Sequence, residues 1–428
     1  MSRTPRGGSL PQSLSEWLQW QQQLHPKSID MGLERSRQVL NRMALVQPPL
    51  VVTVAGTNGK GSVVALLTKL FQLGGYRVGS YTSPHLWRYN ERIALNGEPV
   101  SDSELIAAFN AVEAAREGQP LTYFEFGTLA AFALLVRWRV EVAVLEVGLG
   151  GRLDAVNLWD ADMAIISAIG LDHTAWLGET ETEIAREKAG IMRRDQTVIY
   201  GGRAVVEVIE AEASRRGARL WRAGRDYHWQ QGHSMWQWQS DNHRFTLPLP
   251  ALVGEHQLSN AAAVVMLQQR LPVSVSISLS SVIKALRHWS LPARLERRVV
   301  QPEGVECLLD VSHNPQAVAA LSDWLRRHPA SGRQLALLSM LADKDYTTVI
   351  KIMLPLIDLW YVTDSEGERG LSGRELERVI TAAGGEACYH SDLTTVWRQL
   401  RGQLLTTDRL IVFGSFYSVA AVGALIDE

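Results

Sequence analysis

Residues 51–62 read VVTVAGTNGKGS, a run of β-branched residues followed by a turn with three glycines and one lysine. A strand, a glycine-rich turn and a helix start in this order predict backbone N–H groups that face an anion. Lys60 can reach the β- and γ-phosphates of a nucleotide, and Ser62 offers a hydroxyl to phosphate or Mg²⁺. Gly61 separates these two residues, so the match to G-x-x-x-x-G-K-[ST] is imperfect, and an ordinary glycine turn is the alternative. We expect ATP or GTP to bind at Gly56, Thr57, Asn58, Gly59, Lys60, Gly61 and Ser62.

Around this loop, short β-branched runs alternate with longer amphipathic segments, which predicts an α/β fold with a largely parallel sheet. A second series of the same kind begins after Pro292. We therefore expect an N-terminal P-loop ATPase domain over residues 1–291 and a smaller C-terminal Rossmann-like α/β domain over 292–428. The predicted strands are 50–54, 77–81, 142–147, 163–169, 197–200, 306–311, 334–338, 359–363 and 409–413, and the predicted helices of the first domain are 61–73, 103–116, 126–138 and 181–193.

Residues 221–250 differ in character from the rest. Trp229, Trp236 and Trp238 alternate with Gln and His, which predicts a polar-aromatic hairpin inserted outside the core. Such aromatics can stack on nucleic-acid bases, but the segment has few Lys or Arg residues to hold phosphates. We therefore favour a β insertion over a nucleic-acid interface.

The overall composition excludes several classes of protein. Among 428 residues, 43 Lys and Arg stand against 45 Asp and Glu, which leaves no general basic field for nucleic acid or anionic membranes. Two cysteines, Cys307 and Cys388, are too few for a disulfide framework or a four-thiolate zinc site. Residues 1–10 lack the apolar core of a signal peptide, and the uncharged stretch 411–426 is shorter than the ~20 residues of a spanning helix. We expect a soluble cytoplasmic protein.

Polar residues follow several predicted strands. Glu146 ends a central strand, where a buried carboxylate is costly unless it is paired or binds metal. His173 follows the next strand, and Ser83 follows the strand after the phosphate-loop helix. If these strand ends meet at one edge of the sheet, the three side chains make a Mg²⁺ site. For His173 alone, a hydrogen-bonded loop histidine is the simpler interpretation.

Further segments resemble one enzyme family, in the same order along the chain. The resemblance is to the folate branch of the Mur ligase superfamily, which contains the folylpolyglutamate synthases and the bifunctional bacterial dihydrofolate synthases. With the phosphate loop, the segments that carry it are residues 29–35 (IDMGLER), 83–86 (SPHL), 91–93 (ERI), 121–125 (LTYFE), 146–154 (EVGLGGRLD), 171–174 (LDHT), 186–191 (REKAGI), 255–260 (EHQLSN), 310–315 (DVSHNP) and 413–415 (FGS).

This resemblance implies an ATP-dependent, ADP-forming ligase that adds L-glutamate to 7,8-dihydropteroate and to reduced folates through an acyl phosphate. The form of Tyr123-Phe124 favours the bifunctional enzyme over a folylpolyglutamate synthase alone. A catalytically silent ATP-binding scaffold is a further alternative. A muramyl-peptide ligase would carry an extra domain before Gly56, and Gly61 counts against a P-loop kinase or GTPase. The relatives are usually monomers, and we expect the same here.

The resemblance also assigns roles to single residues. Ser83, Glu146 and His173 match the family's metal ligands, and Lys188 matches a lysine that carries a CO₂-derived carbamate and helps to bind a second Mg²⁺. Without the resemblance, Lys188 would be an exposed or snorkelling lysine. A carbamate requires a neutral amine, and therefore a lysine whose pKa is lowered by burial or by nearby cations.

The nucleotide and acceptor sites follow in the same way. Asn260 resembles the adenine contact, Arg294 the phosphate-binding arginine and Asp310 the ribose-side acid, while Ala293 stands where relatives commonly carry Gly. We expect His313 near the phosphate or the incoming glutamate, with helix capping as the alternative. Lys60, Lys188 and His313 are the expected catalytic residues. The expected dihydropteroate contacts are Ser28, Ile29, Asp30, Thr122, Tyr123, Phe124, Glu125, Leu153, Asp154 and Ala155, among which Phe124 can stack on a ring and Asp154 can accept hydrogen bonds from an aminopyrimidine.

Overall fold

The computed structural model describes residues 10–365, 367 and 369–427, and the chain divides into two units. The last change of unit falls between Trp289 and Ser290, two residues before the boundary expected from the sequence. Two short segments of the N-terminal part also belong to the second unit, which the strand and helix pattern did not indicate. The first unit contains the described residues up to Ile169, Thr180–Ala251 and Leu258–Trp289, and the second contains Gly170–Glu179, Leu252–Gln257 and the described residues from Ser290 onward.

The first unit is built on an eight-stranded sheet with the order β4-β3-β2-β5-β1-β6-β7-β8. Strand β1 (Leu50–Ala55) lies in the middle and is buried at every position, as expected for a parallel strand covered on both faces. Of the strand pairs in this sheet, only β2–β3 and β3–β4 are antiparallel, so the predicted, mostly parallel sheet is confirmed. The other strands are β2 (Val78–Tyr81), β3 (Ile93–Leu95), β4 (Glu98–Pro99), β5 (Val142–Glu146), β6 (Met163–Ile166), β7 (Thr197–Tyr200) and β8 (Arg219–Arg222).

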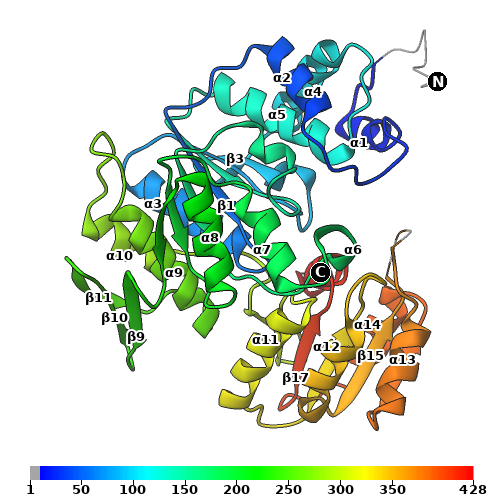
Figure 1. The fold of residues 1–428 in the computed structure, drawn as a ribbon. Helices are drawn as coiled ribbons and strands as arrows, with labels where there is room; N and C mark the ends of the chain where they lie inside the picture. Colours follow the sequence, from blue (N-terminus) through cyan, green and yellow to red (C-terminus); the bar gives the residue numbers. More distant parts are fainter. Residues whose placement is uncertain (1–9, 366, 368, 428) are drawn as a thin grey trace. The chain divides into compact units, whose positions relative to one another are not determined.

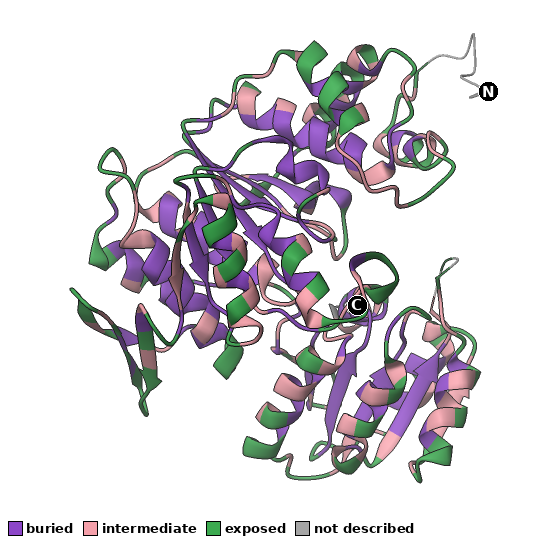
Figure 2. Ribbon diagram, viewed as in Figure 1, coloured by how far each residue is buried: buried purple, intermediate pink, exposed green. Residues whose placement is uncertain are grey.

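Helices cover this sheet, and α1, α2, α4 and α5 gather at one end of the unit, in blue and cyan (Figure 1). Helix α5 begins at Tyr123, earlier than predicted, because Thr122 caps it by accepting a hydrogen bond from the Glu125 N–H. Its Phe126 ring lies 5.7 Å from that of Phe109 in a core that is buried along most of α5 (Figure 2). The helices are α1 (Leu14–Gln22), α2 (Glu34–Met43), α3 (Lys60–Leu73), α4 (Asp102–Arg116), α5 (Tyr123–Arg137), α7 (Glu181–Ala189), α8 (Val206–Arg216), α9 (Glu255–Gln268) and α10 (Leu279–Arg287), with the short helices η1 (Tyr89–Arg92) and η2 (Ala155–Leu158).

The tryptophan-rich segment forms a separate antiparallel sheet of β9 (Tyr227–Gln231), β10 (Met235–Ser240) and β11 (Arg244–Pro248). The prediction of a hairpin outside the core was wrong: the sheet has three strands, and Trp236 and Trp238 are fully buried. Side chains alternate between the two faces of a strand, so these two indoles share the inner face of β10 while the glutamines between them face solvent.

The second unit has a six-stranded sheet with the order β12-β13-β17-β14-β15-β16, in which only β12 is antiparallel to its neighbour. The predicted smaller α/β domain is thereby confirmed, and three of its strands have the predicted bounds. The strands are β12 (Glu296–Val300), β13 (Val305–Leu309), β14 (Gln334–Leu338), β15 (Leu359–Thr363), β16 (Ala387–His390) and β17 (Arg409–Phe413), and the helices are α6 (Thr174–Leu177), α11 (Pro315–Arg327), α12 (Tyr346–Met353), η3 (Leu354–Leu356), α13 (Gly373–Ala382), α14 (Leu393–Arg401) and α15 (Phe416–Asp427).

Apolar side chains on one stripe of each amphipathic helix build the core of this unit. Leu376 and Ile380, one turn apart on α13, are fully buried together with Trp360 of β15. Among the described residues of the whole chain, no helix is long and apolar enough to cross a membrane.

Candidate active site

The glycine-rich loop runs from the end of β1 to the start of α3 at Lys60. Gly59 has a φ of 88°, and a Cβ added to it would lie 2.7 Å from the Asn260 side-chain oxygen. Gly56 has a φ of 152°, and a Cβ there would overlap the Ser167 hydroxyl. Gly59 is therefore required for its left-handed backbone conformation, and Gly56 is required because the Ser167 hydroxyl leaves no room for a side chain. The same contact places Asn260, on α9, directly beside the loop.

The loop is also fastened to the segment after β6. The Thr57 N–H donates to the Ala168 carbonyl at 2.7 Å, and the Ser167 hydroxyl donates to the Asn58 carbonyl at 2.6 Å. These bonds fix the backbone conformation of the loop through the Thr57 N–H and the Asn58 carbonyl, without a ligand. A prearranged loop of this kind binds an anion without a large cost of ordering.

Two lysines meet at the carbonyl of Gly56. Lys60 Nζ donates to the Gly56 and Thr57 oxygens at 3.1 and 3.2 Å, and Lys188 Nζ donates to the Gly56 oxygen at 2.9 Å. Lys188 is buried, so the interpretation of an exposed lysine was wrong. It lies one turn after the buried Ile184 on α7, and this face of the helix turns inward. The two ammonium groups bring positive charge to the mouth of the loop.

Glu146 and Ser83 lie together at the carboxyl end of the sheet. Glu146 is the last residue of β5, is buried, and accepts a hydrogen bond from the Ser83 N–H at 3.2 Å. A carboxylate and a serine hydroxyl are oxygen ligands of the kind that Mg²⁺ prefers, so the residue types at this position fit a divalent metal. His173 belongs to the second unit, where it precedes α6 with a φ of 52°. Its convergence with Glu146 therefore stays a prediction.

Three of the expected acceptor contacts, Asp30, Thr122 and Glu125, belong to one partly buried network. Arg35 Nε donates to the Glu125 carboxylate at 2.9 Å and also pairs with Asp30. Glu125 further accepts hydrogen bonds from the hydroxyls of Thr122, at 2.8 Å, and Ser36, at 2.7 Å. Glu125 therefore fixes the start of α5 to the segment that contains Asp30, and it orders these residues through contacts within the protein.

Phe124 and Asp154 both contact the loop after β5. The Phe124 ring packs on Gly148, where an added Cβ would overlap it, and lies 6.0 Å from the Tyr81 ring. The Asp154 carboxylate is buried and accepts hydrogen bonds from the N–H groups of Leu149 and Val156, at 2.8 and 2.9 Å. Burial raises the pKa of Asp154 to about 7, against the lowering effect of these bonds. Asp154 can therefore hold or release a proton near neutral pH.

The remaining acceptor candidates lie around these residues. Ser28 is exposed, whereas Ile29 and Leu153 are partly buried and Ala155 is buried. The Tyr123 ring packs edge-on against that of Tyr89 at 5.6 Å.

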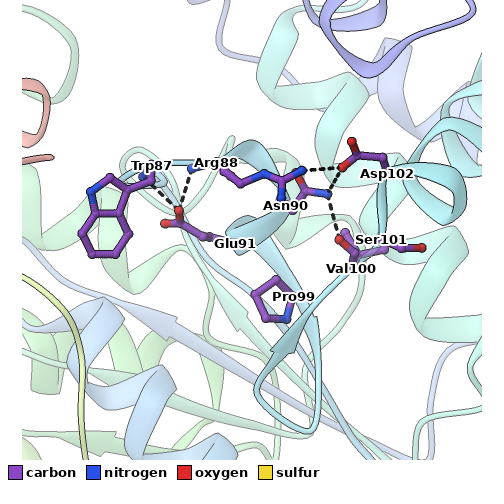
Figure 3. A pocket seen from close by; sticks show the side chains of 8 residues that line it. All are labelled: Trp87, Arg88, Asn90, Glu91, Pro99, Val100, Ser101 and Asp102. Carbon is purple, nitrogen blue, oxygen red and sulfur yellow. Dashed lines mark hydrogen bonds and ion pairs between the residues drawn. The ribbon is translucent and has the colours of Figure 1, made fainter. Parts of the chain in front are cut away.

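A hollow of about 620 Å³ lies beside the loop that follows β2, and it was not expected from the sequence (Figure 3). Glu91 organises one wall by accepting hydrogen bonds from the N–H groups of Leu86, Trp87 and Arg88, at 2.8, 2.9 and 2.6 Å. The exposed Trp87 indole points away from the other labelled side chains (Figure 3). The residues that line the hollow are Trp87, Arg88, Asn90, Glu91, Pro99, Val100, Ser101 and Asp102.

In the second unit, Asp172 is the centre of a charged cluster. Lys344 Nζ lies 2.6 Å from the Asp172 carboxylate, and the side chains of Asn314 and His313 approach it at 3.3 and 3.6 Å. Lys344 Nζ also lies 3.5 Å from Nε2 of His173. Burial alone would raise the pKa of Asp172, but the hydrogen bond from His313 and the neighbouring cationic groups hold it well below its usual range.

Sequence reasoning missed Asp172 and Lys344 as members of the site. The available signal was the run Asp343-Lys344-Asp345, three charged residues that follow an apolar strand and a short loop. Each of the three has its own partner, because Asp343 pairs with Arg369 and Asp345 caps α12. Lys344 is the buried member of the three, and its role was not visible without the contact to Asp172.

Asp310 shapes the turn that carries Arg294. Its carboxylate accepts hydrogen bonds from the N–H groups of Leu295 and Ser312, at 2.7 and 2.9 Å. Ala293 and Leu295 both have left-handed backbone conformations, with φ values of 56° and 48°. The departure from glycine at Ala293 therefore falls at a position that glycine favours. The Arg294 guanidinium lies 5.5 Å from the Phe416 ring centre.

His313 does not cap the following helix, so that alternative was wrong. The cap of α11 is Asn314, which accepts a hydrogen bond from the Ala317 N–H at 3.0 Å. His313 instead places Nδ1 2.8 Å from the Val311 carbonyl, which directs its other nitrogen to Asp172. This leaves His313 in the charged cluster and available for a role other than capping.

The chain matches known proteins over its whole length. The Mur ligase middle domain matches residues 54–268, and the Mur ligase glutamate ligase domain matches residues 293–416. The dihydrofolate synthase/folylpolyglutamate synthase of Escherichia coli is 37% identical, with 100% of this chain and 98% of that protein covered. Its counterpart in Haemophilus influenzae is 36% identical over 97% of this chain and 98% of the relative.

Solved structures give the same relationship. Escherichia coli FolC in complex with DHPP and ADP superimposes with a TM-score of 0.91 at 36% identity, covering 99% of each chain. A bifunctional folylpolyglutamate synthase/dihydrofolate synthase with Mn, AMPPNP and L-glutamate bound gives a TM-score of 0.89 at 38% identity, covering 97% of this chain and 98% of the other. The chain therefore belongs to the Mur ligase family, in its branch of dihydrofolate synthases/folylpolyglutamate synthases.

Proposed function

We propose that this protein is an ADP-forming ligase that joins L-glutamate to 7,8-dihydropteroate, giving dihydrofolate, and to reduced folates, giving folylpolyglutamates. The observation that carries the proposal is the glycine-rich loop, in which Lys60 Nζ lies at the Gly56 and Thr57 carbonyls and neighbouring groups leave no room for a Cβ at Gly56 or Gly59. It is supported by 37% identity along the whole chain to the dihydrofolate synthase/folylpolyglutamate synthase of Escherichia coli.

The reaction needs positive charge more than a nucleophilic side chain. A carboxylate oxygen of the acceptor attacks the γ-phosphorus of ATP, the bond to the β-phosphate oxygen breaks, and ADP leaves. The glutamate amine then attacks the acyl carbon, the carbon–oxygen bond to phosphate breaks, and the amine releases a proton. Several negative oxygens gather in both steps, so fixed cations and backbone N–H groups stabilise the transition states. Lys60 and the loop serve this purpose at the phosphates.

Divalent metal ions are the second source of positive charge in this proposal. Ser83, Glu146 and His173 would hold Mg²⁺, which screens the phosphates from the incoming carboxylate when it is bound. We further propose a second Mg²⁺ and a carbamate on Lys188. The carbamate would replace the positive charge beside the Gly56 carbonyl with a negative one, and the intact protein would show the mass of one CO₂ that is lost on acidification.

The other contacts are proposed residue by residue. Asn260, Arg294 and Asp310 would bind the nucleotide, and His313 would act near the phosphate or the glutamate amine. Phe124 would stack on the pterin or benzoate ring, and Asp154, with its pKa near 7, would pair with the aminopyrimidine in either protonation state. We propose that the enzyme works as a monomer in the cytoplasm, and sedimentation of the purified protein tests the first of these points.

Coupled ADP release tests the function. With Mg-ATP and L-glutamate, ADP should form in the presence of either 7,8-dihydropteroate or a reduced folate, and each product should gain the mass of one glutamate residue. Activity with the folate alone would reduce the function to folylpolyglutamate synthase. ATP binding without glutamate-dependent ADP release from either acceptor would contradict the proposal and favour a silent scaffold.

A further inference from the structure

The tryptophan-rich sheet is joined to helix α9 by one buried hydrogen bond. The indole N–H of Trp238, on β10, donates to the Ala262 carbonyl at 3.1 Å, and both residues are fully buried. A buried indole N–H needs a partner, because an unsatisfied donor in the interior is costly. Ala262 lies inside α9, so the bond fixes the helix at this turn. Figure 1 draws β9–β11 next to α9 in green.

Two residues before Ala262, α9 carries the asparagine that lies against the phosphate loop. The Asn260 side chain is buried and so close to Gly59 that a Cβ there would come within 2.7 Å of it. The same turn is held by a second bond, because the Ser259 hydroxyl donates to the Gly201 carbonyl at 3.0 Å. The turn of α9 from Ser259 to Ala262 is therefore held by two side chains, and a shift of this turn would move Asn260 relative to the loop.

A neighbouring tryptophan is buried to the same extent but has a different hydrogen-bond partner. Trp236 is fully buried on the same face of β10, and its indole N–H donates to the Pro248 carbonyl of β11 at 2.9 Å. Its bond therefore stays within the sheet, whereas that of Trp238 leaves the sheet for α9. Substituting each tryptophan in turn therefore distinguishes a loss of sheet stability from a loss of the bond between the sheet and α9.

We propose that Trp238 is a positioning residue for the nucleotide site, which holds α9 so that Asn260 keeps its place beside Gly59. This inference rests on the proposed function, in which the loop binds ATP. It gives the tryptophan-rich sheet a role: the sheet supports the helix behind the phosphate loop. Trp238 does not touch the nucleotide, and its effect passes through the backbone of α9.

The test compares Trp238→Phe with Trp236→Phe in the full-length protein. Each substitution keeps an aromatic ring and removes one indole N–H, so both should lower the urea midpoint by similar amounts. Calorimetry with ADP and Mg-ATP should show about three- to tenfold weaker binding for Trp238→Phe only, the size expected for one hydrogen bond. The KM for ATP should rise with it, while kcat and the KM for glutamate stay within about twofold of the wild type.

Equal nucleotide affinities in the two variants would overturn the inference, as would a Trp238→Phe protein that binds ADP like the wild type. Ser259→Ala is the second variant, should Trp238→Phe fail to fold, because it removes the other hold on the same turn and should weaken ADP binding in the same direction. In an Asn260→Ala background, the effect of Trp238→Phe should disappear. A wild-type protein that binds no nucleotide would overturn the proposed function itself, and calorimetry on that protein alone reveals it.

Discussion

Two aspartates whose side chains are largely covered, one in each unit, have opposite electrostatic surroundings. Asp154 in the first unit is held by backbone N–H groups, and burial raises its pKa to about 7. Asp172 in the second unit is also largely buried, but Lys344 and His313 face it, and its pKa lies well below the usual range. Burial of a carboxyl group therefore does not decide its charge, which depends on whether charged side chains or neutral dipoles surround it.

The phosphate loop of the first unit and the Arg294 turn of the second also differ in how left-handed backbone positions are stabilised. The first unit places Gly59 at the left-handed position of its phosphate loop, whereas the second unit places Ala293 and Leu295 at left-handed positions in the Arg294 turn. Asp310 accepts the N–H of Leu295 and so compensates for part of the cost. The phosphate loop thus has a residue type that tolerates the conformation, whereas in the Arg294 turn a charged side chain holds it.

The largest effect should come from breaking the Asp172–Lys344 pair. Lys344→Met would leave a buried carboxylate without its closest cation and should destabilise the second unit by about 3–5 kcal/mol. The double variant Lys344→Met/Asp172→Asn removes both charges and should recover most of that loss. Urea unfolding of the two proteins measures the difference. If the double variant is as unstable as the single one, the pair does not act as described.

A smaller effect, with a distinct pH dependence, should come from Asp154. Its pKa in the folded protein, about 7, lies above the ordinary value of 3.8, so the folded state holds the proton more tightly. Its stabilising contribution is full below about pH 4 and is lost as the pH rises towards 7, by about 1.4 kcal/mol per pH unit. Asp154→Asn should flatten this slope in unfolding experiments between pH 5 and 7. The exposed Asp241 provides the control, and Asp241→Asn should keep the slope.

The loop glycines offer a matched pair at nearly equal backbone angles. Gly59 and Gly75 have φ values of 88° and 89°, but a Cβ at Gly59 would meet Asn260, whereas one at Gly75 meets no atom within 4 Å. Both alanine variants should lose about 1–2 kcal/mol of stability through the left-handed conformation. Only Gly59→Ala should also weaken ATP binding, by about tenfold, the equivalent of one further displaced contact. Similar ATP affinities in the two variants would contradict the role of the close approach.

The smallest effect concerns the alanine in the Arg294 turn. Ala44 and Ala293 have φ values of 49° and 56°, and Ala293 is fully buried while Ala44 is exposed. Glycine relieves the strain at both, so Ala44→Gly should stabilise the protein by about 0.5 kcal/mol. The stability change of Ala293→Gly should be about 0.8 kcal/mol less favourable than that of Ala44→Gly, because Ala293→Gly also loses a buried methyl group. Thermal unfolding of the two variants measures the difference, and a clear gain for Ala293→Gly would show that the methyl contributes nothing.

Much of the fold could be predicted because local patterns determine it. Strand β14 (Gln334–Leu338) is a short apolar run between turn residues, and its bounds follow directly from that pattern. The membership of Gly170–Glu179 in the second unit could not be predicted, because it depends on contacts with residues far along the chain. The burial of Trp236 and Trp238 was missed for the same reason, although their spacing of two residues is that of one strand face.

Site residues with a local role could likewise be predicted from the sequence, whereas those defined by distant contacts could not. The phosphate loop could be found in the sequence because its three glycines lie within one short stretch, residues 56–61, and their conformational role is local. Lys344 was missed because its partner, Asp172, precedes it by 172 residues. The buried position of Lys188 could be suspected from the helical spacing to Ile184, but its contact with Gly56 depends on the packing of α7 against the loop.

The most direct test of the central claim follows one oxygen atom. The acceptor is prepared with ¹⁸O in its carboxylate and incubated with ATP, Mg²⁺ and L-glutamate, and the inorganic phosphate is analysed by mass spectrometry. If the carboxylate attacks the γ-phosphorus and phosphate leaves from the acyl carbon, each amide bond formed should yield one phosphate with one ¹⁸O. Unlabelled phosphate, or ¹⁸O found in a nucleotide, would contradict an acyl phosphate and with it the proposed ligase.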